Sequence, residues 1–287
     1  MSRVVVIACC ALLAQGCTVI VSPDETQCSA DADCADRGFA NASCVEEVCV
    51  ETVVDDPIWG CLGNVVEPEP DPTQSLDFPM KLVYASGDSP LETDAVVDIC
   101  DKIDFACTGT DPKYPKGLHP DGEGNVDIEV FEGFDGFVQV THVEIVDTRV
   151  YVGRPIVEPP GVKEVRLLRP FEYDVLASVS GEDPDPTRGT VIAYATDCQG
   201  LSASGVRFES PNADGGSTEF YLINQSPAVP PTATATDGDG FGGFFNLPAG
   251  SSIVRTYRDV DDEFIGESSF QILGNTISFL QVAPTPQ

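Results

Sequence analysis

Cysteine spacing constrains this chain more than any other feature of its sequence. Of its eleven cysteines, four follow the pattern Cys-x5-Cys-x9-Cys-x4-Cys from Cys28 to Cys49. These 22 residues contain almost no apolar side chains, so hydrophobic burial cannot fold them. We therefore expect two crossed disulfides to hold residues 28–50 together as a cysteine-rich module.

The other cysteines indicate an exported protein. Arg3 precedes an apolar run from Val4 to Leu13, which is typical of a signal peptide (residues 1–16) and too short to span a bilayer. If this peptide is removed and Cys17 is modified, eight cysteines remain, an even number that suits an oxidising compartment. The predicted disulfide cysteines are Cys28, Cys34, Cys44, Cys49, Cys61, Cys100, Cys107 and Cys198.

The pairing of these eight cysteines stays open, because eight cysteines allow 105 connectivities. Six residues separate Cys100 from Cys107, so a local bridge is easy to form. That bridge would leave Cys61 and Cys198 as a candidate pair between distant parts of the chain.

The segment Leu12-Leu13-Ala14-Gln15-Gly16-Cys17 resembles the lipobox of bacterial lipoproteins, except that this family usually has Leu where Ala14 stands. The resemblance implies that Cys17 carries lipid, that residues 17–27 form a tether and that the membrane is a partner through this anchor. Thr18, in place of Asp, implies the outer membrane or cell surface by the enterobacterial sorting rule. An ordinary secretory signal with an unmodified Cys17 is the alternative.

The module at residues 28–50 is similar to the EGF-like and Dickkopf-N-terminal-like modules that follow the lipobox in many bacterial surface proteins. Zinc binding is the alternative for clustered cysteines, but the module has no CxxC pair and no nearby His. Asp31, Asp33 and Asp36 could suggest calcium, although acidic residues in such a loop are more often solvated. We predict no metal and no cofactor.

Charge excludes one class of partner. The chain has 15 basic and 47 acidic residues, a formal net charge of −32 that is spread along nearly its whole length. Nucleic acid needs Lys or Arg to replace its counterions, so nucleic-acid binding is excluded.

From Trp59 onward the sequence predicts an all-β fold, because short runs rich in Val, Ile, Phe and Tyr alternate with Gly, Pro, Asp and Asn. One short helix is expected at residues 171–178, after Pro170 and before Gly181. The predicted strands are 80–85, 95–99, 126–130, 137–140, 191–195, 206–209, 219–223, 253–257 and 276–282.

An internal repeat divides this β region in two. Tyr84-Ala85-Ser86 aligns with Tyr194-Ala195-Thr196 at an offset of 110, and Asp121-Gly122-Glu123-Gly124 recurs as Asp237-Gly238-Asp239-Gly240. We therefore predict two tandem Greek-key β-sandwich domains, at residues 58–157 and 164–287.

The second copy resembles the carboxypeptidase-regulatory-like (transthyretin-like) domain. The resemblance rests on Gly189-Thr190-Val191, on Thr236-Asp237-Gly238-Asp239-Gly240 with Phe244, and on Leu247-Pro248-Ala249-Gly250. It implies a hairpin whose Phe244 and Leu247 reach the core. Such domains serve as stability modules, adhesion spacers and sometimes carbohydrate-binding surfaces, so the fold alone does not decide function.

No catalytic motif is found, and we predict a protein that is not an enzyme. The two histidines, His119 and His142, belong to no known constellation, and HExxH, GxSxG and phosphate-binding loops are absent from the sequence. A hydrolase that uses paired carboxylates is the third hypothesis. Asp237-x-Asp239 begins like a calcium-binding EF-hand loop, but Pro248 stands where the loop needs Glu.

Two aromatic residues are candidates for ligand binding. Trp59 and Phe134 lie in Gly-rich stretches, where exposed rings could form flat platforms for sugars. The main hypothesis is a noncatalytic outer-membrane or cell-surface lipoprotein that acts as a structural or interaction module. A carbohydrate-binding surface protein is the alternative, and a cell-surface glycan or protein is the expected partner.

Overall fold

The computed structural model describes residues 28–37, 42–45, 47–51, 56–224, 226–230 and 232–286. The predicted signal peptide and the predicted lipidation site, Cys17, lie outside the described residues. The chain divides into two compact units, Met1–Asp55 and Asp56–Gln287, which we describe separately. Among the described residues, no helix combines the length and apolar content that crossing a bilayer requires.

In the first unit, two disulfides join one short helix to one hairpin. The helix α1 spans Asp31–Asp36, and the strands β1 (Ala42–Val45) and β2 (Val48–Glu51) pair antiparallel. The bridges Cys28–Cys44 and Cys34–Cys49 interleave, so the predicted crossed pairing is confirmed. The sulfur atoms of Cys28, Cys34 and Cys49 lie within 4.8 Å of one another because these two bridges are neighbours.

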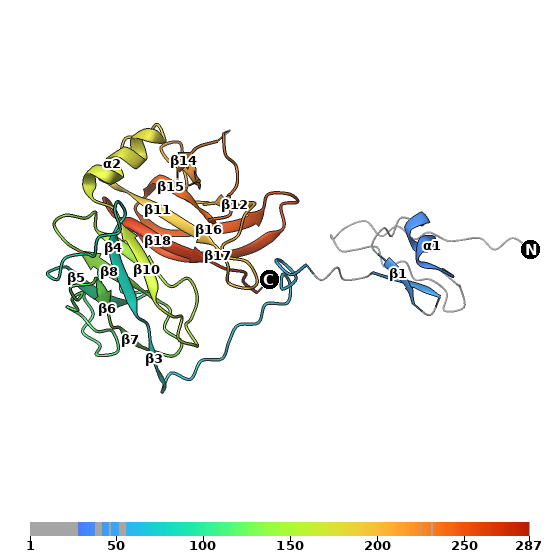
Figure 1. Cartoon of the computed structure of the whole chain (residues 1–287), viewed down its shortest axis with the longest axis horizontal. Helices are drawn as coiled ribbons and strands as arrows, with labels where there is room; N and C mark the ends of the chain where they lie inside the picture. The colour runs from blue at the N-terminus through green and yellow to red at the C-terminus, as the bar shows by residue number, and fades with distance from the viewer. Residues whose placement is uncertain are drawn as a thin grey trace, which may run out of the picture. The chain divides into compact units, whose positions relative to one another are not determined.

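The second unit is built from strands, which confirms the all-β prediction. Its first half forms a sandwich in which the sheet β10-β4-β6 packs against β5, β8 and β9, and β3 pairs with β7 beside them (Figure 1). The strands of this first sandwich are β3 (Ser75–Asp77), β4 (Met80–Tyr84), β5 (Val96–Asp101), β6 (Asn125–Val126), β7 (Glu129–Phe131), β8 (Gly136–Thr141), β9 (Thr148–Tyr151) and β10 (Lys163–Leu167).

The second half repeats this plan. The order β18-β11-β15 matches β10-β4-β6, with one parallel and one antiparallel pairing in each, and β12-β16-β17 matches β5-β8-β9. The predicted repeat therefore corresponds to a repeated topology. The strands are β11 (Arg188–Ala195), β12 (Val206–Glu209), β13 (Thr218–Ile223), β14 (Ser226–Ala228), β15 (Phe241–Pro248), β16 (Gly250–Arg258), β17 (Phe264–Ile272) and β18 (Ile277–Val282).

Strand pairing places the boundary between the halves later than the sequence prediction did. Lys163–Leu167 was assigned almost entirely to the second domain, but β10 pairs with β4 in parallel and buries Val165 and Leu167 in the first core. The first sandwich therefore ends at Leu167. Its last strand is the equivalent of β18, which was predicted correctly.

Between the halves lies the predicted helix, α2 (Pro170–Val179). The Glu172 carboxylate accepts the Arg169 backbone N–H at 2.8 Å, which caps the N-terminus. At the other end Gly181 adopts φ 80°, and the N–H of Glu182 bonds to the carbonyl of Ala177, which closes the helix as a Schellman motif. Tyr173 and Ala177 pack on the outer face of the second sandwich.

A single eight-stranded sheet joins the two sandwiches. Its order is β14-β13-β15-β11-β18-β9-β8-β5, and the joint is the parallel pairing of β9 with β18. Gly153 follows β9 with φ 81°, and a Cβ there would lie 2.2 Å from the Gln281 carbonyl oxygen. Only glycine fits this close approach. The two halves therefore form one compact unit instead of two separate domains.

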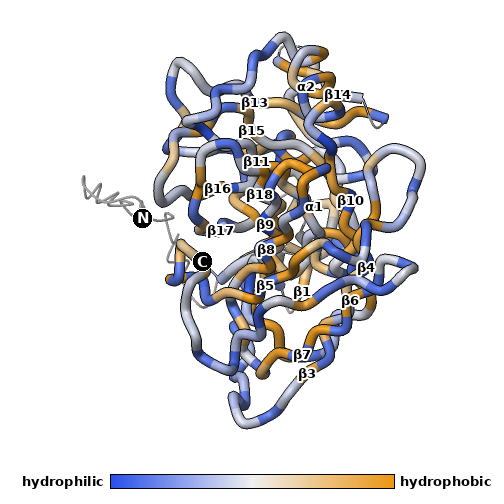
Figure 2. The backbone as a smooth tube through the Cα atoms, turned by 90° about the vertical axis from the view of Figure 1, so that its left-hand side faces the viewer, coloured by the Kyte–Doolittle hydropathy of each residue, from blue (hydrophilic) through white to orange (hydrophobic). Residues whose placement is uncertain are grey.

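Both faces of the shared sheet are buried in its first-half part. Val138 and Val150 point into the first core, while their neighbours Phe137 and Tyr151 point into the second. Alternate side chains of a strand face opposite sides, so the same strands contribute to two cores. Figure 2 shows the hydrophobic residues gathered along the strands and the hydrophilic ones along the loops.

Candidate functional site

A row of polar side chains crosses the shared sheet at the joint. Asp98 on β5 lies opposite Gln139 on β8, Gln139 lies opposite Arg149 on β9, and Arg149 lies opposite Ser278 on β18. Phe137 and Tyr151, which flank this row on the same face, are buried aromatic residues of the second core. The polar row therefore interrupts the second core where the two sandwiches meet.

Arg149 is the most buried charged residue of this row, with 2% of its surface exposed. Its Nε and Nη2 donate to the Gln139 Oε1 at 3.1 and 2.9 Å, and its guanidinium lies 4.6 Å from the centre of the Phe137 ring. Gln139 therefore holds the Nε–Nη2 edge of the guanidinium, and Nη1 has no hydrogen-bond partner in the described structure.

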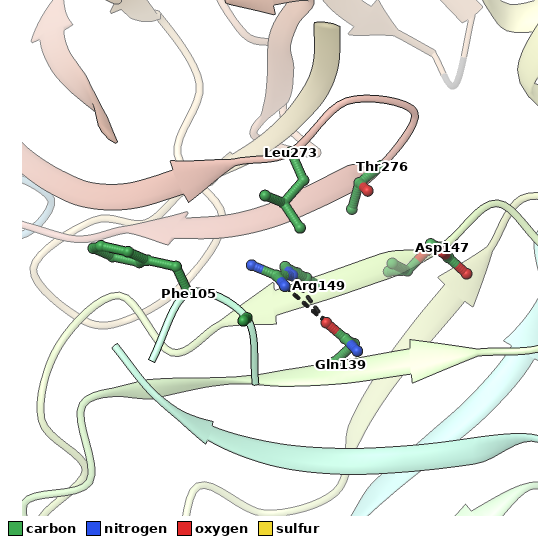
Figure 3. A pocket seen from close by; sticks show the side chains of 8 residues that line it. Phe105, Gln139, Asp147, Arg149, Leu273 and Thr276 are labelled. Atoms are coloured by element: carbon green, nitrogen blue, oxygen red, sulfur yellow. Dashed lines mark hydrogen bonds between the residues drawn. The ribbon is translucent and has the colours of Figure 1, made fainter. Parts of the chain in front are cut away.

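A cavity of about 460 Å³ lies above this row (Figure 3). Its floor comes from β8 and β9, one wall from the loop between β5 and β6, and the other from the turn between β17 and β18. The lining residues are Phe105, Ala106, Gln139, Asp147, Thr148, Arg149, Leu273 and Thr276. Both sandwiches contribute, and ligand sites occur preferentially at such junctions.

The cavity has a buried positive charge, Arg149, and an exposed negative charge, Asp147. Asp147 stands at its mouth with an exposed side chain; partial desolvation raises the pKa of its carboxyl group, and the Arg149 charge opposes this rise. Burial also raises the pKa of Tyr151, which the nearby Arg149 charge opposes as well. No ion pair links Arg149 to Asp147 within 4.0 Å, so the buried cation has no bonded counter-ion in the described structure.

The wall that carries Phe105 is held by a disulfide. Cys100 and Cys107 are bridged across the loop, and the Lys116 Nζ lies 2.9 Å from the Cys107 Sγ and donates to the Cys107 carbonyl at 3.2 Å. Burial lowers the pKa of Lys116. Phe105 is 46% exposed, so this ring borders both the cavity and the solvent.

The remaining predicted pair, Cys61 with Cys198, is also bridged. This bridge fastens the segment before the first sandwich to the second sandwich. The Cys198 N–H donates to the Ile58 carbonyl at 3.0 Å, and the Gln199 side chain donates to the Pro57 carbonyl at 2.8 Å. All eight cysteines predicted to be oxidised are therefore in disulfides.

One of the two candidate ligand-binding aromatics is corrected by the structure. Phe134 is 0% exposed and packs in the first core against Tyr114 and Phe131, so it cannot form a platform. The Gly-rich setting of Phe134 reflects a tight approach, because a Cβ at Gly136 would lie 2.6 Å from its ring. Trp59 is half-buried against the second core and stays a prediction.

Both histidines have hydrogen-bond partners in the described structure. The His119 Nδ1 is hydrogen-bonded to the Ala95 carbonyl at 2.7 Å, and the His142 Nε2 to the Asp94 carboxylate at 3.1 Å. The Asp237 carboxylate accepts the N–H groups of Asp239 and Asn224, which a tight turn requires. These oxygens thus stabilise a tight turn before β15, where the sequence predicted a turn and no EF-hand loop. The predicted hairpin is wrong, because β15 pairs with β13 and β11, and the next strand, β16, lies in another sheet.

Arg149, the central residue of the cavity, was missed from the sequence. The segment around it, Thr148–Tyr151, was not predicted as a strand because a charged residue interrupts a short apolar run. The available signal was the arginine itself, set between Thr148 and Val150 and followed by Tyr151. A charged residue amid β-branched and aromatic residues indicates a buried polar position.

No protein-family model and no curated protein matches the chain. Among solved structures, the Bacillus anthracis TIE protein is 13% identical, with a TM-score of 0.25, over 74% of this chain and 34% of that protein. The shaft pilin SpaA from Lactobacillus rhamnosus GG is 9% identical over 75% of this chain and 98% of the pilin, with a TM-score of 0.22. A variant of BcpA, the major pilin subunit of Bacillus cereus, is 12% identical over 74% and 70%, with a TM-score of 0.24. These similarities are too low to assign a function to the chain.

Proposed function

We propose that the chain is an exported, lipid-anchored surface protein whose two joined sandwiches act as a noncatalytic structural or interaction module. The observation that carries this proposal is that four disulfides join eight cysteines. Such cross-linking persists in oxidising compartments and is rare in the cytosol. The lipid at Cys17 is inferred from the sequence.

The position of one bridge supports a mechanical role. If the N-terminal side is the anchor, a pulling force travels along the chain and reaches the Cys61–Cys198 bridge before the first sandwich. The bridge passes that force directly into the second sandwich. The Arg258 guanidinium, 3.6 Å from the Asp56 carboxylate, adds a noncovalent contact at the same place. The first sandwich is then carried without being stretched.

Both edges of the eight-stranded sheet support a module that does not polymerise by strand addition at this sheet. The outer edge of β5 is covered by a loop, with backbone hydrogen bonds between Val97 and Leu118 in both directions. At the opposite end of the sheet, β14 is short and contains Pro227. Covered edges and edge prolines are common protections against edge-to-edge pairing.

Lipidation is tested by metabolic labelling with radioactive palmitate in a bacterial host with a lipoprotein pathway. We expect label on the wild-type protein, recovery in the membrane fraction, and loss of both with Cys17→Ser. A Cys10→Ser variant is the matched control and should keep the label. An unlabelled, soluble wild-type protein whose mature N-terminus is not Cys17 would contradict the anchor.

Surface display is tested separately by adding protease to intact cells. We expect the full-length protein to disappear from intact cells while a periplasmic marker survives. Protection of the protein until the outer membrane is permeabilised would contradict display and place the module inside the cell envelope.

A further inference from the structure

The buried Arg149 is unusual in a chain with so many acidic residues. Six other arginines of the second unit form ion pairs with carboxylates, namely Arg166, Arg169, Arg188, Arg207, Arg255 and Arg258. Arg149 has no such pair although it is more buried than any of them. A buried charge without a counter-ion is destabilising, so a missing carboxylate at this place calls for a physical reason.

From this cavity we infer that the junction between the sandwiches binds a small monocarboxylate with an apolar body, its carboxylate on the Arg149 guanidinium and its apolar part against the apolar lining residues, Leu273 foremost. This inference goes beyond the proposed surface role and does not depend on it. Arginine is well suited to the task because its planar N–H groups match a carboxylate. The cavity volume of about 460 Å³ is in the range of small-molecule sites.

The other polar groups favour a carboxylate over phosphate or sulfate. The Thr148 hydroxyl donates to the Val146 carbonyl at 2.8 Å, and the Thr276 hydroxyl donates to the Gly274 carbonyl at 3.2 Å. Neither has a proton left for the additional oxygens of a tetrahedral anion. The Asp147 carboxylate at the mouth repels a dianion more strongly than a monoanion.

The apolar walls explain why an organic acid fits better than a bare ion. Phe105, Ala106 and Leu273 supply the apolar part of the cavity lining. In Figure 3 Leu273 lies above Arg149, and Phe105 lies to the left with its ring pointing away from the guanidinium. An aromatic or branched aliphatic body would remove these side chains from water. Its carboxylate would then meet the guanidinium in a partly dehydrated setting, where a charge-assisted hydrogen bond is strong.

The test uses the full mature protein and two probes of the same shape. Benzoate carries the carboxylate and benzamide is its neutral counterpart, so both can be titrated by calorimetry and by ¹H–¹⁵N NMR. We expect benzoate to bind with a Kd of about 1 mM, as for a fragment-sized ligand, and benzamide at least tenfold more weakly. Equal binding of the two probes, or no binding of benzoate, would overturn the inference.

Two arginine variants then locate the site. Arg149→Met keeps an unbranched, shorter side chain and removes the charge and the N–H donors, and we expect it to weaken benzoate binding at least tenfold. Arg166→Met removes an exposed arginine of β10 and should leave the Kd unchanged. An Arg149→Met protein that binds benzoate as tightly as the wild type would contradict the assignment.

A folding defect in Arg149→Met would leave the probe comparison intact, because that comparison uses only wild-type protein. Chemical-shift changes confined to the backbone amides of residues 105–106, 147–149 and 273–276 provide the second location test. Inorganic phosphate is the third arm. Tighter binding of phosphate than of benzoate at this site would overturn the choice of ligand class.

Discussion

Phe134 and Phe137 show how much a single position decides in this chain. They lie three residues apart, and both are fully buried, yet Phe134 points into the first core and Phe137 into the second. Phe137 lies on β8, where successive side chains alternate between the two faces, whereas Phe134 lies before this strand in an isolated bridge to Ile156. Arg149 on β9 lies on the same face of the sheet as Phe137, and there it lines a cavity to which both sandwiches contribute residues.

Replacing Phe134 by Ala should therefore destabilise the protein instead of removing a ligand contact. Its ring packs in a T-shaped arrangement, 6.1 Å from that of Phe131, and the cavity left behind would cost about 3–5 kcal/mol. Urea unfolding followed by circular dichroism measures this loss in the free energy of unfolding. Leu201→Ala, an exposed apolar position, is the control and should change it by less than about 0.5 kcal/mol.

Glu219 gives a prediction about pH. Burial raises the pKa of its carboxyl group, while the hydrogen bond from the Tyr221 hydroxyl and the Arg207 charge oppose that rise. The folded protein thus binds this proton more readily than the unfolded chain, whose Glu has a pKa of about 4.3. As pH increases above that value, the contribution of Glu219 to stability decreases.

Glu219→Gln should remove this decrease. We expect the variant to gain stability relative to the wild type between about pH 4 and pH 7, measured by urea unfolding at each pH. The control, Glu123→Gln in an exposed turn, should follow the wild-type curve. A difference between Glu219→Gln and wild type that stays constant across this range would refute the prediction.

At the scale of elements, the sequence predicted those helices and strands whose ends are marked by residues next to them in the chain. The helix α2 was predicted because Pro170 and Gly181 mark its ends, and β4 and β11 because their apolar runs are bounded by turn residues. Among the strands that were missed are β9, β10 and β17. The apolar run of β9 is interrupted by Arg149, which lines the cavity. β10 contains three charged residues, Lys163, Glu164 and Arg166, beside its two buried residues. β10 pairs with the distant β4, and β9 pairs with the neighbouring β8 and with the distant β18, so the parallel pairings that place both strands are not visible in any local pattern.

The Cys61–Cys198 bridge acts on the segment that precedes the first sandwich. The two cysteines are 137 residues apart, so the bridge removes far more freedom from the unfolded chain than Cys100–Cys107, which spans 7. By the chain-entropy argument the two contributions are about 5 and about 2.5 kcal/mol. Replacing Cys61 and Cys198 by Ala should therefore destabilise the protein by about 2.5 kcal/mol more than replacing Cys100 and Cys107.

Urea unfolding of the two double variants measures this difference, and limited proteolysis adds a local readout. Without the Cys61–Cys198 bridge we expect cleavage near residue 65 to become faster, since only noncovalent contacts then hold the segment. An equal loss of stability in the two variants would contradict the argument from loop length.

At the scale of the whole molecule, the shared sheet makes the two sandwiches interdependent. Phe137 and Tyr151 belong to the first half by sequence but are buried in the second core, where the Tyr151 hydroxyl donates to the Gln271 carbonyl at 2.8 Å. Unfolding either half alone would expose these rings, at about 1.5–3 kcal/mol each. It would also leave the edges of β9 and β18 unpaired.

Residues 56–287 should therefore unfold in one cooperative transition instead of two. Trp59, the single tryptophan, packs against the second core and reports its unfolding by fluorescence. Hydrogen exchange of β4, detected by mass spectrometry at each urea concentration, reports the first. We expect the two midpoints to coincide within error, and Gly153→Ala, which obstructs the β9–β18 pairing, to separate them. Two separate midpoints in the wild-type protein would show that the sandwiches fold independently and that the joint contributes little to stability.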